Sequence, residues 1–279
     1  MGVFCCILGG LDMSKTFNYL LPLLGMSLAF TGCLQPTAHS MGATLMPAPL
    51  QHRSDASNKG QQLEAAASGF WGHTQESDNV KSVDAGGGNL SVTYRLGGIV
   101  SPLFINATAG AFGGKLNFAC TDSNCESSRE KSEYSNWLKT EEGKDDYGFW
   151  NLQERILAGL DFNAGPFLIA GAAGGIQLYQ GGGDYDDMRD ELDQQNIVND
   201  VDGSSGYAPT ASAWIGSHFG RHGEYGQFVV EYSLLFKGAA DDWTHSMKYT
   251  YTHPTGFFGG VSEGNLMSFT AFVGKQFVF

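Results

Sequence analysis

The chain has 279 residues, of which 39 are glycine, 13% are aromatic and only 16% are charged. Helical and α/β enzymes usually carry more Leu, Ala, Glu and Lys, so this composition favours closely packed, twisted β-strands. The net charge of −13 argues against a nucleic-acid partner, because no basic patch exists to displace counterions from phosphates. The whole acidic excess falls in three segments, Thr121–Tyr147, Gln180–Gly206 and Gly238–Gly264.

Residues 1–32 have the pattern of an N-terminal extension followed by an export signal. Met13 precedes a basic residue, Lys15, then an apolar run from Leu20 to Phe30 and then small residues, which is the order found in secretory signal peptides. Met13 is therefore the expected start of the protein. The apolar run is shorter than the ~20 residues that a transmembrane helix needs.

The end of the signal, Ala29-Phe30-Thr31-Gly32-Cys33, resembles the lipobox of bacterial lipoproteins, although Phe30 stands where Leu is usual. The resemblance implies that Cys33 becomes the acylated first residue of the mature chain. Ordinary signal cleavage without a lipid is the alternative. Residues 33–60 then lack periodicity and are rich in Pro, Ser, Gln and His, so we expect a flexible tether between the lipid anchor and the body.

Residues 61–279 contain eight strand-like stretches; apolar and polar residues alternate with the period of a β-strand in all but the fifth, which is nearly all apolar or Gly. They are Leu63–Thr74, Asn89–Leu96, Leu103–Ala119, Tyr147–Phe162, Phe167–Tyr179, Tyr207–Phe219, Tyr225–Lys237 and Met267–Phe279. In the third stretch the phase slips at Gly113-Gly114, which predicts a β-bulge that keeps Leu116 on the apolar face. In the fourth stretch, Glu154 falls on the apolar face. A bulge or a shifted register would explain this position.

The predicted connections alternate strictly between longer and short segments. The longer ones are 75–88, 121–146, 180–206 and 238–264, and the short ones are 97–102, 163–166 and 220–224. A β-sandwich with Greek-key crossings gives no reason for this alternation, whereas an up-and-down meander with unlike surroundings at its two ends does.

The last stretch ends on Phe277 and Phe279, after alternating hydrophobic residues that only Lys275 interrupts. This resembles the closing strand of bacterial outer-membrane β-barrels, whose assembly machinery reads a C-terminal Phe. The chain as a whole is similar to small barrels of the OmpA-domain, OmpX and OmpW kind. The resemblance implies an all-β, eight-stranded antiparallel up-and-down transmembrane barrel in the outer membrane, with a periplasmic N terminus, short periplasmic turns and long extracellular loops. The closing strand should pair with Leu63–Thr74, and Lys275 should snorkel to water.

The polar strand faces must then point inward, because a charge on the lipid face costs ~2–4 kcal/mol near the midplane. Glu64, Arg95, Arg155 and Glu231 are predicted to form a network of internal ion pairs, with a catalytic or gating set as the alternative. Aromatic residues near the strand ends predict two interfacial girdles, Trp71, Trp150, Tyr207 and Phe236 on the outer side and Phe162, Phe219 and Phe279 on the inner side.

The outer segments hold three candidate features. Cys120 and Cys125 predict a local disulfide in an exported chain. Asp184, Asp186, Asp187 and Asp190 are hard oxygen ligands that could bind calcium, although their spacing is not that of an EF-hand and a solvated acidic loop is the alternative. Aromatic residues amid polar ones suggest adhesion: Trp137, Trp243, Tyr249, Tyr251, Phe257 and Phe258.

These patterns favour a structural or surface-interaction protein of the outer membrane that displays acidic, aromatic loops to an extracellular ligand. A narrow channel for small solutes is the first alternative, and a lipid-modifying barrel enzyme is the second. We expect no enzymatic activity and no cofactor, because the sequence lacks the His-x-Ser-Asn motif of barrel deacylases and the G-x-S-x-G elbow of serine hydrolases.

Overall fold

The computed structural model describes residues 37–38, 44–52, 60–77, 80–97, 102–118, 133–164, 167–200, 203–220, 223–236, 244–264 and 267–279. The chain divides into two units, Met1–Pro36 and Thr37–Phe279, and every described residue belongs to the second. The predicted start at Met13, the lipidated Cys33 and the disulfide between Cys120 and Cys125 all lie outside the described residues. No helix among the described residues is long and apolar enough to cross a membrane.

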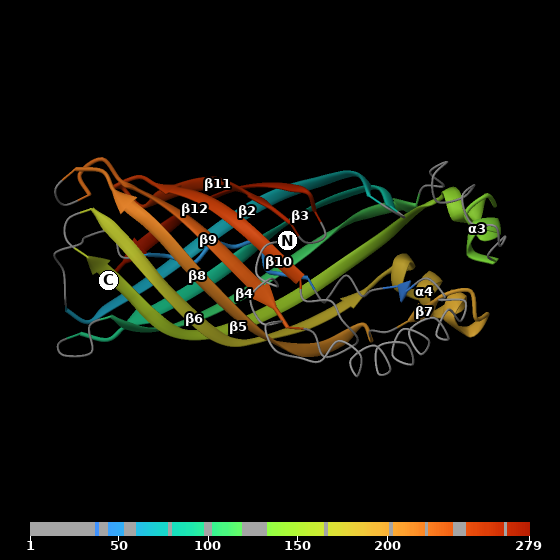
Figure 1. The fold of residues 1–279 in the computed structure, drawn as a ribbon, viewed down its shortest axis with the longest axis horizontal. Helices are drawn as coiled ribbons and strands as arrows, with labels where there is room; N and C mark the ends of the chain where they lie inside the picture. The colour runs from blue at the N-terminus through green and yellow to red at the C-terminus, as the bar shows by residue number, and fades with distance from the viewer. Residues whose placement is uncertain are drawn as a thin grey trace, which may run out of the picture. The chain divides into compact units, whose positions relative to one another are not determined.

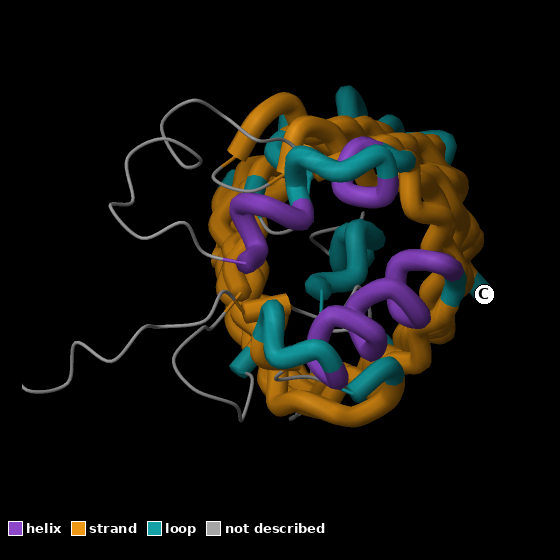
Figure 2. Tube along the Cα trace, turned by 90° about the vertical axis from the view of Figure 1, so that its right-hand side faces the viewer, coloured by secondary structure: helices purple, strands orange, loops and turns teal. Residues whose placement is uncertain are grey.

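Ten strands close into one antiparallel barrel (Figures 1 and 2). Each barrel strand pairs with the barrel strand that follows it in the chain, and the last pairs with the first. The strands are β2 Gln62–Ser77, β3 Val80–Arg95, β4 Leu103–Phe118, β5 Asp146–Ala164, β6 Leu168–Gly182, β8 Ser205–His218, β9 Gln227–Leu235, β10 Thr244–Thr252, β11 Phe257–Glu263 and β12 Phe269–Val278.

The prediction of eight strands is wrong, because the segment 238–264 contains β10 and β11 rather than one long loop. Strand β10 lacks the aliphatic alternation of the others, since its buried side chains are Ser, Lys and Thr, and β11 has Gly259-Gly260 at its centre. The connection predicted at 75–88 is also mostly strand, because β2 and β3 pair from Gln62–Arg95 up to Ser77–Val80. The strict alternation of long and short connections therefore disappears.

Two of the connections carry further elements at the same end of the barrel, which we call the loop end. Helix α3 Glu133–Trp137 and the short 3-10 helix η2 Glu142–Lys144 follow β4, whereas helix α4 Asp184–Gln194 and strand β7 Asn199–Asp200 follow β6. The two connections pack together through a cluster of Trp137, Leu138, Leu192 and Val198. The opposite end, where β3 is joined to β4 and β5 to β6, is the turn end.

The predicted pairing of the last strand with the first is confirmed. Strand β12 pairs with β2 from Phe269–His73 to Val278–Glu64. Lys275 faces outward near the turn end, where its Nζ donates a hydrogen bond to the carbonyl of Thr255 and lies 4.1 Å from the centre of the Phe257 ring. The lysine thus reaches the polar turn between β10 and β11, as a snorkelling side chain does.

The predicted bulge at Gly113-Gly114 is wrong. The pairing of β3 with β4 runs without a shift from Ser82–Asn117 to Arg95–Phe104, so Leu116 points inward and is buried. Glu154 lies on the outward face in a regular register, opposite Ala109 and Leu178, so neither a bulge nor a shift accounts for it. The structure offers no physical reason for this acidic side chain on the outward face.

Residues 44–52 run inside the barrel. Figure 2 shows this stretch as a loop within the ring of strands. All nine of these residues are buried. The predicted flexible tether over residues 33–60 is therefore corrected for its described part. The inward wall surrounds these residues and hydrogen-bonds several of their backbone groups, which the segment's lack of periodicity did not reveal.

The described chain enters this interior from the loop end. Strand β1, Thr37–Ala38, pairs in parallel with β7, which belongs to the connection between β6 and β8. Residues 44–52 then contact the wall progressively nearer the turn end, where β2 begins. The N terminus itself lies outside the described residues.

The ten-strand register predicts a specific cross-strand disulfide. Tyr249 and Val261 are directly opposite in the β10–β11 pair, and opposite residues have Cα atoms ~4.5–5.5 Å apart, within the range that a disulfide bridges. We expect Tyr249→Cys with Val261→Cys, in a background whose native cysteines are serines, to oxidise readily in the folded protein, as measured by gel mobility with and without reductant.

The matched control pairs Tyr249→Cys with Gly259→Cys, which is displaced by two positions on the same strand and should oxidise much less. Equal oxidation of the two pairs would indicate a loop here and would contradict the ten-stranded register.

Candidate functional site

The inner wall binds residues 44–52 mainly through their backbone. The wall donates hydrogen bonds to four backbone carbonyls and accepts one from a backbone N–H. The contacts are Gln153 Nε2 (2.9 Å) and Gln177 Nε2 (2.6 Å) to Thr44 O, Lys248 Nζ (3.2 Å) and Arg155 Nη2 (3.5 Å) to Ala48 O, Arg95 Nη2 to Gln51 O (2.5 Å), Gln227 Nε2 to His52 O (3.2 Å), and Leu50 N to Glu231 Oε2 (2.9 Å).

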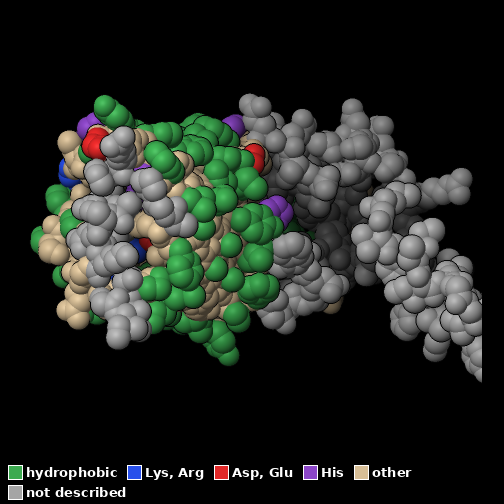
Figure 3. Space-filling view, turned by 60° about the vertical axis from the view of Figure 1, so that its left-hand side comes forward, with side chains coloured by type: hydrophobic (Ala, Val, Ile, Leu, Met, Phe, Trp, Pro, Cys, Tyr) green, Lys and Arg blue, Asp and Glu red, His purple; other side chains and the backbone are tan. Residues whose placement is uncertain are grey.

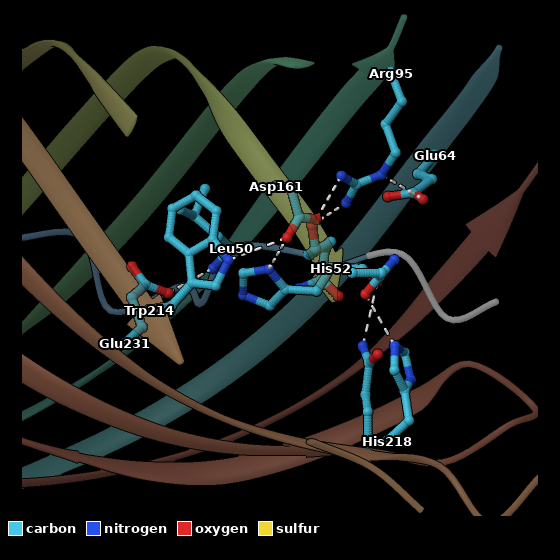
Figure 4. A network of polar contacts seen from close by, with 11 residues as sticks. Leu50, His52, Glu64, Arg95, Asp161, Trp214, His218 and Glu231 are labelled. Carbon is cyan, nitrogen blue, oxygen red and sulfur yellow. Dashed lines mark hydrogen bonds and ion pairs between the residues drawn. The ribbon is translucent and has the colours of Figure 1, made fainter. Parts of the chain in front are cut away.

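Arg95 is the centre of a first polar network, at the turn end (Figure 4). Its Nε lies 2.9 Å from Glu64 Oε1 and its Nη1 lies 2.7 Å from Asp161 Oδ2, and all three side chains are buried. The other carboxylate oxygen of Asp161 accepts a hydrogen bond from Trp214 Nε1 at 3.1 Å and lies 3.6 Å from His52 Nδ1. This network therefore joins β2, β3, β5 and β8 to residues 44–52, which we call the luminal segment.

A second network lies closer to the middle of the barrel. Glu231 Oε1 is 3.2 Å from Lys248 Nζ and accepts a hydrogen bond from Ser233 Oγ at 2.8 Å, while its other oxygen accepts one from Leu50 N. Arg155 is buried beside the same acid, and its Nε and Nη1 have no hydrogen-bond partner among the described residues. The two networks together hold three acidic and three basic side chains, so their formal charges cancel.

The four residues predicted to form one network therefore divide between two. Glu64 pairs with Arg95 as one unit, whereas Arg155 and Glu231 belong to the other. The predicted set does not include Asp161, and it missed Lys248 because β10 was taken for a loop. The inward position of Lys248 opposite Glu231 follows from strand alternation once β10 is recognised.

Apolar side chains of the luminal segment pack against two apolar clusters on the inner face of the wall. Leu50 packs in a cluster with Phe104, Leu157, Ile169, Ala173, Trp214 and Val229, and Leu45 packs with Ala208 and Leu235. The ring of His52 lies 5.0 Å from that of Trp214, between centroids. The segment is thus held by apolar contacts as well as by hydrogen bonds to its backbone.

Toward the loop end the inward face becomes apolar. The buried cluster there comprises Ala66, Phe70, Val83, Ala85, Phe112, Leu116, Phe149, Tyr185, Phe258, Met267 and Phe272. Phe112 makes edge contacts with Phe70 and Phe149 at centroid distances of 6.0 and 6.1 Å. Tyr185 belongs to α4, so this helix covers the apolar half of the interior. Because the predicted interior was polar throughout, this half is a finding of the structure.

The predicted aromatic loops for adhesion are not supported. Trp137 is buried between the two outer connections, and the other described aromatic candidates lie in β10 or β11 rather than in loops. Phe258 even points into the apolar half of the interior. Trp243 lies outside the described residues.

The predicted acidic loop after β6 is largely helix α4. Asp184, Asp186 and Asp187 occupy its first turn, where negative charge is favourable at a helix N terminus. Asp186 pairs with the buried Arg189 at 2.8 Å, and Asp190 lies one turn further on. Among the described residues, no three acidic, His or Cys side chains are gathered closely enough to hold a metal ion.

The outward wall carries an apolar belt. Figure 3 shows hydrophobic side chains covering one face of the described wall. On β3, for example, Leu90 is 67% exposed and Val92 is 48% exposed. The residues predicted to form two aromatic girdles are all exposed: Trp71, Trp150, Tyr207, Phe236, Phe162, Phe219 and Phe279. Beyond Trp71 toward the loop end, His73 and Asp84 form a polar pair at 2.6 Å, which ends the belt on β2 and β3.

No family model and no curated protein matches the sequence. The fold is similar to those of solved outer-membrane proteins. OprG from Pseudomonas aeruginosa is 7% identical with a TM-score of 0.37, covering 79% of this chain and 96% of OprG. The COG4313 outer membrane channel from Pseudomonas putida F1 is 9% identical with a TM-score of 0.41, covering 83% and 100% of the two chains.

The ΔS2S3 mutant of TodX, a monoaromatic hydrocarbon channel, is 9% identical with a TM-score of 0.29, covering 79% of this chain and 68% of that one.

Removing Arg95 tests the network at the turn end. Arg95→Met should lower the free energy of unfolding by about 3–5 kcal/mol, because it leaves two buried carboxylates without their cation. Adding Glu64→Gln and Asp161→Asn to the same variant should recover part of this loss, because the acidic charges then disappear. Urea unfolding of the barrel measures each value.

Lys115→Met is the control, because Lys115 is an exposed cation and its loss should change the stability by no more than about 0.5 kcal/mol. A loss for Arg95→Met that the two further substitutions deepen would contradict the role given to Arg95.

Proposed function

We propose that the protein is an outer-membrane β-barrel channel for small solutes, whose lumen is closed at rest by its own residues 44–52. Its lipid partners are then those of the outer membrane, and the barrel-assembly machinery inserts it. No catalytic role and no cofactor form part of this proposal.

The apolar outward belt supports the membrane placement. In the closed barrel each described wall strand pairs with a neighbour on both sides, and such closure is the condition for a β-structure to cross a bilayer. The exposed aromatic residues near the strand ends have the positions of interfacial girdles. The six charged side chains of the two internal networks point inward, where they contact one another and the luminal segment.

One observation carries the channel proposal: the interior is filled by a separate stretch of chain rather than by wall side chains alone. The interior of a barrel of about 8 strands is just wide enough for its own side chains to fill, and the diameter grows with strand number. Here ten strands enclose nine buried residues that form no part of the wall. A lumen that holds a polypeptide chain has room for a small solute when that chain moves aside.

The structure weakens the alternative of a surface-interaction protein. The described aromatic candidates for adhesion lie in strands or in the packed contact between the outer connections. Displacement of residues 44–52 would clear the polar half of the lumen and leave the barrel wall intact.

Replacing residues 44–52 with nine Gly and Ser residues should open the channel. In planar bilayers we expect the full chain to give rare or very small openings, and the replaced variant to give stable, reproducible openings that pass uncharged solutes in liposome-swelling assays. The same replacement of residues 53–59 is the control, since it keeps every luminal contact described above. Equal and negligible conductance of all three proteins would exclude the channel.

The belt is tested separately by a charge on the outward face. Leu90→Arg should destabilise the barrel in lipid vesicles by ~2–4 kcal/mol, whereas Gln180→Arg, on the outward face near the loop end, should cost only ~0–1 kcal/mol. Urea unfolding from the vesicles measures both. Similar costs at the two positions would contradict the membrane placement.

A further inference from the structure

The wall recognises the backbone of the luminal segment more than its side chains. Seven of the hydrogen bonds described above end on backbone atoms of residues 44–52, at the carbonyls of Thr44, Ala48, Gln51 and His52 and at the N–H of Leu50. Polar side-chain contacts of the segment with the wall include that of Thr44 Oγ1 with Gln153 and that of His52 with Asp161. Backbone atoms are common to every peptide, so this mode of binding does not depend on one particular sequence.

The chemistry of the segment matches the donors on the wall. Pro47 and Pro49 have no backbone N–H, and each also biases the residue before it toward an extended conformation. The segment therefore offers more carbonyl acceptors than N–H donors. The wall opposite presents three glutamine amides, two guanidinium groups and one ammonium group as donors, with the carboxylate of Glu231 as the acceptor for Leu50 N–H.

Two apolar side chains of the luminal segment indicate which residues the site would prefer in an occupant. Leu50 enters the cluster around Trp214 and Leu45 enters the smaller one beside Leu235, five residues apart along the segment. Each side chain is nearly fully buried there. An occupant of this site therefore needs apolar side chains at these two positions.

Arg155 has capacity beyond its present contact. It is 1% exposed and lies inside the lumen, where its Nη2 reaches Ala48 O at the long distance of 3.5 Å. Its Nε and Nη1 have no partner among the described residues. A guanidinium with free donors inside the lumen would bind a carbonyl or carboxylate of an occupant placed slightly differently from residues 44–52.

We infer that the lumen is a binding site for extended, proline-containing peptides with two apolar anchors, and that residues 44–52 are its built-in occupant. This rests on the proposed function in one respect, because it names short peptides as the solute class that the channel admits. Binding itself requires only that residues 44–52 be displaced.

The test uses the variant in which Gly and Ser replace residues 44–52, together with a fluorescent peptide of the sequence Thr-Leu-Met-Pro-Ala-Pro-Leu-Gln-His. Fluorescence anisotropy should show saturable binding to the replaced variant, and binding at least about tenfold weaker to the full chain, whose own segment competes for the site. Heat-modifiable gel migration verifies that the barrel is folded. If the replaced variant does not fold, Leu50→Asp in the full chain is used in its place to weaken the occupant.

Peptide and wall variants then separate this recognition from adventitious adsorption. Changing the Thr and Gln of the peptide to Ala should alter the affinity by less than about threefold, whereas changing both Leu residues to Asp should weaken it by at least about tenfold. Gln177→Leu in the wall removes a donor to the backbone and should weaken binding, whereas Gln180→Leu, on the outward face, should not.

Absence of saturable binding, equal binding of the Leu and Asp peptides, or equal effects of the two wall variants would overturn the inference. Its failure is distinguishable from that of the channel. A replaced variant that conducts but binds no peptide supports the channel and excludes the peptide site. A replaced variant that binds peptide but does not conduct supports the peptide site and excludes the channel.

Discussion

The structure depends on satisfying polar groups inside a closed barrel. The inward wall carries three acids and three bases that are almost completely buried, and a charge buried without a partner destabilises a fold strongly. Some of these charges pair across neighbouring strands, as Glu231 does with Lys248. Glutamine, arginine and lysine side chains of the wall also donate hydrogen bonds to backbone carbonyls of residues 44–52. The hydrogen-bond donors of the wall and the carbonyl acceptors of the luminal segment are therefore complementary.

The position of this polar region divides the interior in two. Toward the turn end the lumen is polar and occupied by the luminal segment, while toward the loop end it is lined by Phe and other apolar side chains under α4. The apolar half needs no hydrogen-bonded partner, so its own side chains and Tyr185 fill it. A solute that enters from the loop end would meet an apolar surface first and a backbone-binding surface second.

Closure by a backbone-bound segment reconciles a filled lumen with transport. A lumen filled only by wall side chains would have to repack its wall to open, whereas in the polar half of this lumen the groups that block it belong to one stretch of chain. Displacing that stretch exposes Arg95, Arg155 and Lys248 beside their acidic partners, so the opened lumen would carry no formal charge excess. The same hydrogen bonds thus explain why the lumen is closed and what it could bind.

The candidate site was predictable only in part. Strand alternation put Glu64, Arg95, Arg155 and Glu231 on inward faces, and all four are buried there. Which of these side chains pair depends on their positions along the barrel axis and on which strands are neighbours. The residue pattern of a single strand gives neither. Lys248 was missed because β10 alternates between polar and aromatic residues rather than polar and aliphatic ones. The luminal segment was missed because an extended, proline-containing stretch has no periodicity.

By itself the sequence determined an all-β wall, the inward and outward faces of its strongest strands, and the closure of Phe269–Val278 on Gln62–Ser77. The wall and its faces follow from period-2 alternation, a property of neighbouring residues that the backbone imposes locally. The closure of the last strand on the first was implied by the resemblance to outer-membrane barrels. Only the tertiary structure decided the number of strands, the pairing of the buried charges and the occupant of the lumen. Each of these depends on the width of the closed barrel and on groups distant in sequence that meet only once it has closed.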